Sequence, residues 1–211
     1  MKCIFTSAKS IQISFVVLMS LVVTSFLSID ALDVRLAVEP NHSTILFSVP
    51  ISNGMTRVTG KFKEYTMDIE YDSIQFTNSK ILVNIKAASI DTGIDGRDDH
   101  LRTADFFDTE TYPEISFVST SITEIDSTHF LLLGDFTMHG VSKQIEVPLV
   151  LNGKDGKYTL GFSARLSLNR TDYGVGSDFK HSSMENFIGD EIGVEIDFWT
   201  KKWKAPKTEE K

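Results

Sequence analysis

Apolar and polar residues alternate along most of the chain after residue 42, and a period of two is typical of half-buried β-strands. Turn dipeptides such as Asn53-Gly54 and Asp155-Gly156 separate some of the alternating stretches. About eight strands with short connections predict an all-β antiparallel meander that closes into a barrel or a sandwich. The alternating stretches are residues 45–51, 55–62, 65–71, 81–87, 115–125, 130–138, 145–151, 158–168 and 192–198.

One polar segment, residues 89–117, interrupts this alternation. It begins with an Asp-Thr-Gly turn at residues 91–93, in which the Asp side chain can bond its own backbone and Gly accepts a positive φ. Asp95 then stands at a helix N-cap position, so we expect a short helix over residues 96–104. Leu101 is the single large aliphatic residue of this helix, which therefore buries little surface and is expected to lie over one end of the sheet.

The size of the inward residues decides whether such a barrel is filled or hollow. An eight-stranded barrel has an interior just wide enough for side chains or for one small ligand. Alternation alone favours a filled core and leaves an apolar cavity as the alternative. The large inward candidates are Phe47, Phe117, Phe136 and Phe162, and the small ones that would leave space between them are Ala87, Gly134 and Ala164.

The N-terminus has the pattern of an export signal. Lys2 and Lys9 precede an apolar stretch over residues 11–27, which predicts a signal peptide of residues 1–31, with an uncleaved membrane anchor as the alternative. The protein is then expected in the periplasm or secreted. Cys3 is the single cysteine and lies in this signal, so the mature chain would contain neither a disulfide nor a reactive thiol.

The charge of the mature chain argues against polyanion binding. Removing residues 1–31, which carry two lysines and one aspartate, takes the net charge from −8 to −9. A protein this acidic is not expected to bind nucleic acid, and it would contact a membrane only transiently. We assign residues 32–200 to the folded domain and residues 201–211 to a charged, solvated tail.

Nine segments at fitting intervals make this chain resemble the YceI family of lipocalin-like, mostly periplasmic bacterial proteins associated with long-chain lipids. The resemblance extends from about residue 41 to residue 198, and the chain departs from it at Pro50-Ile51, where the family often has a histidine. The segments are NHSTI (41–45), FSV (47–49), VTGKF (58–62), SIDTG (89–93), RDDHLR (97–102), DFFD (105–108), YPEISF (112–117), GDFTMHGV (134–141) and NRTDYGV (169–175).

This resemblance implies an elongated eight-stranded antiparallel barrel with the short helix near one end and a lipid tail inside. The implied function is non-enzymatic: the barrel sequesters or carries a polyisoprenoid or another long-chain amphiphile, and no cofactor is expected besides this lipid. A polar lipid head needs hydrogen bonds where it leaves water. The expected ligand-binding residues are Arg97, His100 and Arg170 at the head group, Phe106, Phe107, Tyr112 and Tyr173 at the rim, and Phe117, Phe136 and Phe162 inside.

Other interpretations of the same residues stay open. His100 with Asp98 or Asp99 could serve as an acid/base pair of a hydrolase-like enzyme or bind a metal, although no GxSxG motif and no second histidine at ligand spacing accompany them. The structural interpretation is a charge-paired helix in which Arg97 and Asp91 fix the loop, while Arg170 pairs with Asp172 or Asp91. A filled barrel would instead suit a stress or interaction module, as a monomer or a homodimer.

Overall fold

A computed structural model describes residues 34–182, 184 and 187–204. The predicted signal peptide and the end of the predicted tail lie outside the described residues. The described part contains eleven strands, one α-helix and four short 3-10 turns. They are β1 (Val34–Val38), η1 (Pro40–His42), β2 (Thr44–Ile51), β3 (Thr56–Phe62), β4 (Tyr65–Tyr71), η2 (Phe76–Asn78), β5 (Lys80–Lys86), η3 (Ala87–Ser89), β6 (Ile90–Asp91), α2 (Asp95–Arg102), β7 (Glu114–Glu124), β8 (His129–Met138), β9 (Val141–Asp155), β10 (Thr159–Asn169), η4 (Arg170–Tyr173) and β11 (Glu191–Lys202).

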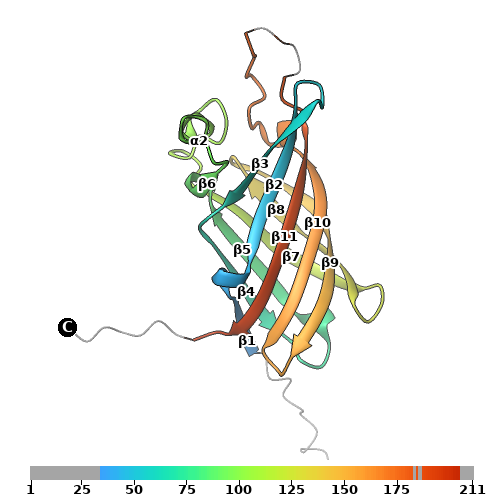
Figure 1. Cartoon of the computed structure of the whole chain (residues 1–211). Coiled ribbons are helices and arrows are strands. Elements are labelled where there is room, and N and C mark those ends of the chain that lie inside the picture. The colour runs from blue at the N-terminus through green and yellow to red at the C-terminus, as the bar shows by residue number, and fades with distance from the viewer. Residues whose placement is uncertain (1–33, 183, 185–186, 205–211) are drawn as a thin grey trace, which may run out of the picture. The chain divides into compact units, whose positions relative to one another are not determined.

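The strands form one closed antiparallel barrel, as predicted. Eight of them follow one another around the wall in the order β1, β4, β5, β7, β8, β9, β10 and β11, and the pairing of β1 with β11 closes the ring. The remaining three, β2, β3 and β6, extend this sheet from the upper part of β11. In Figure 1, β1 and β4 lie at one end of the barrel, and β3, β6 and α2 lie at the other.

Three neighbouring strands are interrupted at the same level of the barrel, and this explains why eleven elements give an eight-stranded wall. β1 and β2 lie one after the other along β11, β3 continues into β4, and β5 continues through η3 into β6. Ser89 stabilises the break, since its hydroxyl donates to the Lys86 carbonyl oxygen at 2.7 Å and accepts from the Glu64 backbone N–H at 3.0 Å. Beyond the break β6 pairs with β3, and α2 contacts β6.

Most local predictions from the sequence are confirmed. Asn53, His139 and the glycines that follow them adopt the positive φ that tight hairpins need. A β-carbon at Gly60 would lie 2.4 Å from the Phe47 ring, so the glycine allows the close approach of this ring. Two features differ: β1 was not predicted, and β11 continues through Lys202, where it pairs with β1, so the first two residues of the expected tail belong to the sheet.

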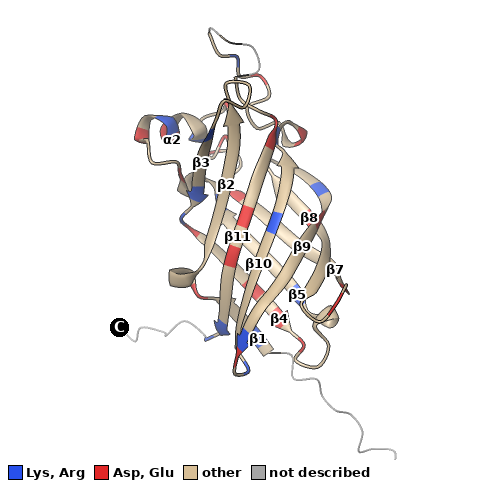
Figure 2. Cartoon of the chain, turned by 45° about the vertical axis from the view of Figure 1, so that its right-hand side comes forward, with Lys and Arg blue, Asp and Glu red and all other residues tan. Residues whose placement is uncertain are grey.

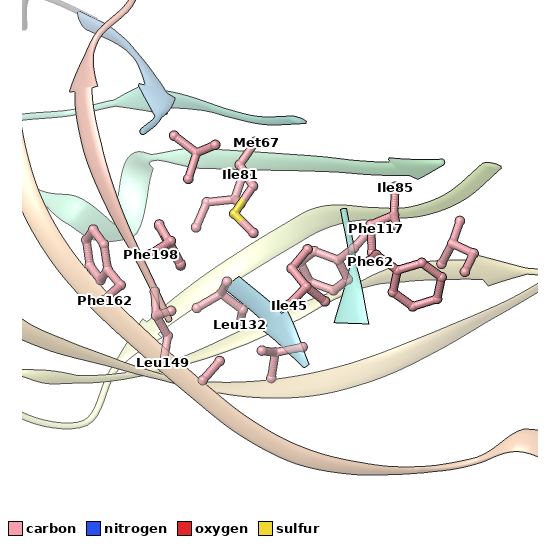
Figure 3. Packing of buried hydrophobic residues seen from close by; sticks show 14 of the residues in the cluster. Ile45, Phe62, Met67, Ile81, Ile85, Phe117, Leu132, Leu149, Phe162 and Phe198 are labelled. Carbon is pink, nitrogen blue, oxygen red and sulfur yellow. The ribbon is translucent and has the colours of Figure 1, made fainter. Parts of the chain in front are cut away.

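The end of the barrel nearest β1 is filled by aromatic rings. Phe162 stacks between Phe198 and Phe76, with ring centroids 5.2 and 5.6 Å apart, and Phe130 meets Phe76 edge-on at 4.7 Å. Figure 3 shows Phe162 and Phe198 at one end of the buried cluster, with aliphatic side chains between them and the more distant Phe117. Charged residues lie outside, where Figure 2 shows them along β10 and β11 and on α2.

Candidate functional site

The half of the barrel toward α2 encloses an apolar cavity of about 470 Å³. This volume falls within the range of small-molecule sites, about 300–1,000 Å³. Its walls come from the barrel strands, and the segments around α2 and around residues 175–188 complete the lining. The filled core that alternation favoured is therefore correct for the β1 end and wrong for the α2 end. The polar residues that line the cavity are Arg97, His100, Ser116 and Arg170.

Some inward residues of this half are not covered by other side chains. Val49, Leu168 and Val194 face the cavity and stay partly exposed, whereas Leu160 on the same strand as Leu168 is 2% exposed. An apolar surface that other side chains do not cover is available to an apolar ligand. The hollow is thus a property of the inner wall and not of a single small residue.

The expectation about small residues is corrected at two of three positions. Ala164 lines the cavity, but Ala87 is buried outside its lining. At Gly134 a β-carbon would lie 2.5 Å from the Phe117 ring, so the missing side chain makes room for that ring and creates no free space.

Helix α2 starts one residue earlier than predicted and ends two residues earlier. Ile94, not Asp95, occupies the N-cap, and no side chain caps it. The buried Asp98 bonds the loop before the helix, since its carboxylate accepts from the backbone N–H of Thr92 at 2.9 Å and also from the Thr92 hydroxyl. This contact ties the first turn of the helix to the preceding loop.

Arg97 is held by Thr92 and retains free donors. Its Nε donates to the Thr92 hydroxyl at 2.7 Å and its Nη2 to the Thr92 carbonyl oxygen at 2.8 Å. Within residues 34–182, 184 and 187–204, Nη1 has no hydrogen-bond partner and no carboxylate forms an ion pair with Arg97. Arg97 and Asp91 each fix the loop, as the structural interpretation predicted, but they do not pair with each other, since Asp91 pairs with Lys63 at 3.7 Å. The Gly93 backbone N–H bonded to Asp91 lowers the pKa of that carboxyl.

His100 does not form the acid/base pair considered from the sequence. Its Nε2 lies 2.8 Å from the Asp105 carboxylate, while Asp98 binds Thr92 and Asp99 binds Arg102 at 2.8 Å. The imidazole ring meets Phe106 edge-on, with centroids 5.1 Å apart, and the Phe179 ring at 5.6 Å. His100 therefore packs the helix segment against the loop that contains Phe179.

Arg170 has no donor left for a ligand. Its guanidinium donates to the carbonyl oxygens of Val175 and Gly176 at 2.8 Å through Nη1, to Gly189 at 2.9 Å through Nε, and to Ile188 at 3.2 Å through Nη2. Nη2 also bonds Asp190 at 2.8 Å, which uses all five N–H groups. Burial lowers the pKa of Arg170, and Asp190 opposes this effect. The predicted partners Asp172 and Asp91 are wrong, and Arg170 instead fastens both ends of the loop over residues 175–189.

The aromatic candidates separate into two groups. Phe106, Phe107, Phe117 and Phe136 line the cavity together with Arg97, His100 and Arg170. Tyr112, Phe162 and Tyr173 do not. Tyr112 packs on His139 at 4.6 Å, Phe162 belongs to the packed end, and Tyr173 packs edge-on against Phe136 at 5.3 Å.

Sequence reasoning missed the lining residues of the loop after η4. Phe179, Phe187 and Ile188 face the cavity, although none of them was among the expected ligand-binding residues. The aromatic residues of this loop were the available signal, but they do not alternate and so gave no strand pattern. Ser116 was missed as well, since it is the polar neighbour of inward Ile115 and Phe117.

The described residues contain neither a metal-binding cluster nor a membrane-spanning helix. Within residues 34–182, 184 and 187–204, no three His, Cys, Asp or Glu side chains lie close enough together to hold a metal ion. In the same ranges no helix has the length and the apolar character needed to cross a bilayer.

Comparison with known proteins decides the family. The model of the YceI-like domain matches residues 36–199. The chain belongs to the YceI-like family. A UPF0312 protein of Shewanella sp. (strain ANA-3) is 33% identical to it over 149 residues, which are 69% of this chain and 78% of that protein.

Solved structures agree with the YceI-like fold. BcnA of Burkholderia cenocepacia superimposes with a TM-score of 0.69 at 22% identity, over 77% of this chain and 98% of BcnA. A polyisoprenoid binding domain from Saccharophagus degradans, implicated in plant cell wall breakdown, superimposes with a TM-score of 0.66 at 16% identity, over 81% of this chain and 99% of that domain. At these identities the likeness concerns the fold.

Segments that resemble the YceI-like family meet at the hollow end of the barrel. His139 Nδ1 lies 3.0 Å from the Tyr173 carbonyl oxygen, and Tyr112 packs on the same imidazole. Lys143, just beyond the GDFTMHGV segment, forms an ion pair with Asp172 at 3.3 Å. Three of the nine segments thus build one corner beside the cavity.

Proposed function

We propose that this protein binds a long-chain amphiphilic lipid, such as a polyisoprenoid, without covalent chemistry and carries or sequesters it in the barrel. The chain of the lipid lies in the apolar cavity, and its polar head lies beside Arg97 and His100. The bound lipid is the ligand, and the activity needs no other cofactor.

The cavity carries this proposal. Its lining is almost entirely apolar, and each CH₂ group moved from water into such a lining contributes about 0.8 kcal/mol. Arg97 brings unpaired N–H donors to the same cavity, and a polar head that leaves water needs such partners. An apolar interior with Arg97 and its free donors at the lining suits a molecule with a long tail and a polar head.

The family relationship supports the same proposal. One structural neighbour is described as a polyisoprenoid binding domain, and the fold is shared over most of this chain. His100 pairs with Asp105, and the two aspartates considered as its partners in hydrolysis bind Thr92 and Arg102 instead.

We further propose that the protein is exported, with residues 1–31 acting as a cleaved signal. Edman sequencing of the protein recovered from the cell envelope tests this proposal. A mature N-terminus close to residue 32 supports cleavage, whereas recovery of Met1 in the membrane fraction supports the uncleaved anchor.

Native mass spectrometry of mature protein, purified from its own envelope without detergent and followed by organic extraction, tests lipid binding. The expected result is one long-chain lipid per barrel, and the same spectrum reports whether the protein is a monomer or a homodimer. Protein that carries no lipid and takes up no added isoprenoid alcohol contradicts the proposal and favours an interaction module.

Substitution of Ala164 locates the lipid within the barrel. Ala164→Phe fills the cavity from β10 and is expected to abolish uptake in a folded protein. Ser163→Phe is the matched control, since Ser163 is the neighbouring residue on the outer face of the same strand. Gly134→Phe is unsuitable for this test, because its side chain would meet the Phe117 ring and the Val118 carbonyl oxygen. Unchanged uptake by folded Ala164→Phe argues against an interior site.

A further inference from the structure

The cavity ends on an aromatic floor. Phe198 lines the cavity and is 6% exposed, and Phe162, its cross-strand partner on β10, does not line it. These two rings stack with an interplanar angle of 26°, and Phe162 stacks on Phe76 at 21°. Phe198, Phe162 and Phe76 therefore form one stacked layer at the end of the cavity, and Figure 3 labels Phe162 and Phe198 at that end of the buried cluster.

This floor is packed on its far side. Phe162 is 2% exposed and its neighbour Leu160 equally so, and in a close-packed interior a ring can move only if its neighbours move. Behind the rings, the fully buried Thr200 hydroxyl donates to the Tyr158 carbonyl oxygen at 2.7 Å and accepts from the Leu160 N–H at 3.1 Å. A ligand chain that reaches Phe198 cannot push further along the barrel without breaking packed contacts.

The opposite end of the ligand also has a fixed position, under the proposed function. Arg97 is oriented by two hydrogen bonds to Thr92, and Thr92 is held in turn by the buried Asp98. A head group bound there and a chain stopped at Phe198 define one length. A longer chain must leave its excess in water, and each exposed CH₂ group lowers the affinity about fourfold.

We infer that Phe198 acts as a chain-length ruler, so that the protein selects linear amphiphiles whose chains extend from Arg97 to the aromatic floor. This inference rests on the proposed function and deepens it, since it assigns the specificity for chain length to one residue. Ala164 stands one inward position above the floor on β10, where it pairs with Ile196, while Phe162 pairs with Phe198. Enlarging Ala164 should therefore raise the floor, and truncating Phe198 should lower it.

Competition among homologous lipids tests the ruler. Each protein is incubated with an equimolar mixture of isoprenoid alcohols that differ by single isoprene units, and native mass spectrometry gives the distribution bound. Phe198→Leu is expected to shift this distribution toward longer chains, with the ratio of longer to shorter ligand changing by about tenfold, as added methylene groups in a hydrophobic pocket do. Ala164→Leu is expected to shift it toward shorter chains.

Phe130→Leu is the matched control. Phe130 is as buried as Phe198, at 5% against 6%, and belongs to the same aromatic cluster, but it does not line the cavity. It should lower the stability and leave the distribution unchanged. Equal distributions for wild type and folded Phe198→Leu overturn the ruler alone, as does the same shift in Phe130→Leu. Wild-type protein that binds no alcohol of the series overturns the proposed function and the ruler with it.

Discussion

At the end of the barrel nearest β1, inward side chains from opposite walls touch one another, whereas at the end nearest α2 they face an empty volume. Phe162 and Leu160 are each 2% exposed in the first region, and Leu168 on the same strand is partly exposed in the second. All three residues follow the same alternation along β10. The difference therefore arises from what lies across the barrel interior and not from the character of the strand.

The closure of the wall accounts for this difference in packing between the two ends. Near β1 eight strands pair in a complete ring, and the interior is just wide enough for side chains. Beyond the breaks at η1 and η3, β2, β3 and β6 extend the sheet from β11, and residues 92–113 are inserted between β6 and β7. The packed end thus supplies stability, and the end where the ring is interrupted supplies the space for a ligand.

A matched pair of truncations on β10 tests most directly whether the two ends of the barrel differ in packing. Leu160→Ala removes a packed side chain and is expected to cost about 2–5 kcal/mol, whereas Leu168→Ala removes one that already lacks neighbours and should cost less than about 1 kcal/mol. Urea unfolding of the lipid-free proteins measures both. Equal losses would show that the α2 end is as well packed as the β1 end.

A second test concerns the hydrogen bonds by which Arg170 holds the loop at the hollow end. Arg170→Ala removes five hydrogen bonds that hold both ends of the loop, and we expect a loss of about 2–3 kcal/mol, since bonds of charged groups are stronger than neutral ones. Hydrogen exchange should accelerate in residues 174–182 and 187–190 and remain slow in β1 and β4. The control, Arg165→Ala, breaks ion pairs on the outer face and should cost about 0–1 kcal/mol. Uniform acceleration along the chain would contradict a local role.

The sequence was informative about the wall and less so about what lies within it. Alternation and turn residues predicted the strands, the hairpins and the inserted helix, because each depends on neighbours in the chain. Alternation states which face a residue such as Leu168 occupies, but not whether a side chain from another strand reaches it. For this reason alternation alone favoured a filled core for the whole barrel, although a filled core is present at one end.

Partners of charged residues were predicted poorly for a related reason. Arg170 was assigned to acids in nearby motifs, yet its carboxylate partner is Asp190, and four of its five bonds go to backbone carbonyl oxygens. Every residue has such a carbonyl group, so no residue type marks the contact. Likewise Arg97 binds Thr92, whereas the interpretation from charge named Asp91 beside it.

Arg97 allows a smaller test of the hollow end. Arg97→Met keeps a long side chain but removes the donors, so affinity for the extracted lipid should fall about tenfold, the equivalent of one hydrogen bond of a charged group. Arg57→Met, on the outer side of β3, is the control and should leave the affinity unchanged. Lipid binding is measured by titration into delipidated protein. Equal affinities for both variants would place the head group away from Arg97.

The smallest expected effect is a pH dependence that belongs to the packed end. Asp72 accepts from the backbone N–H of Gln75, from the Asn78 amide and from the backbone N–H of Ile74, and these bonds hold its pKa below the usual range. A carboxyl whose pKa is lowered by folding stabilises the protein above its unfolded-state pKa, and this contribution disappears as the pH falls through the folded-state pKa.

Asp72→Asn removes this contribution at all pH values. Wild type should therefore exceed Asp72→Asn in unfolding free energy at neutral pH, and the difference should shrink on acidification. Urea unfolding at neutral and at acidic pH measures this difference in unfolding free energy. Asp72 bonds the turn η2, which contains Phe76 of the packed end. Lipid affinity at neutral pH should therefore be the same in wild type and Asp72→Asn. A stability difference that grows on acidification would contradict the lowered pKa, and a loss of lipid affinity would mean that the two ends are not independent.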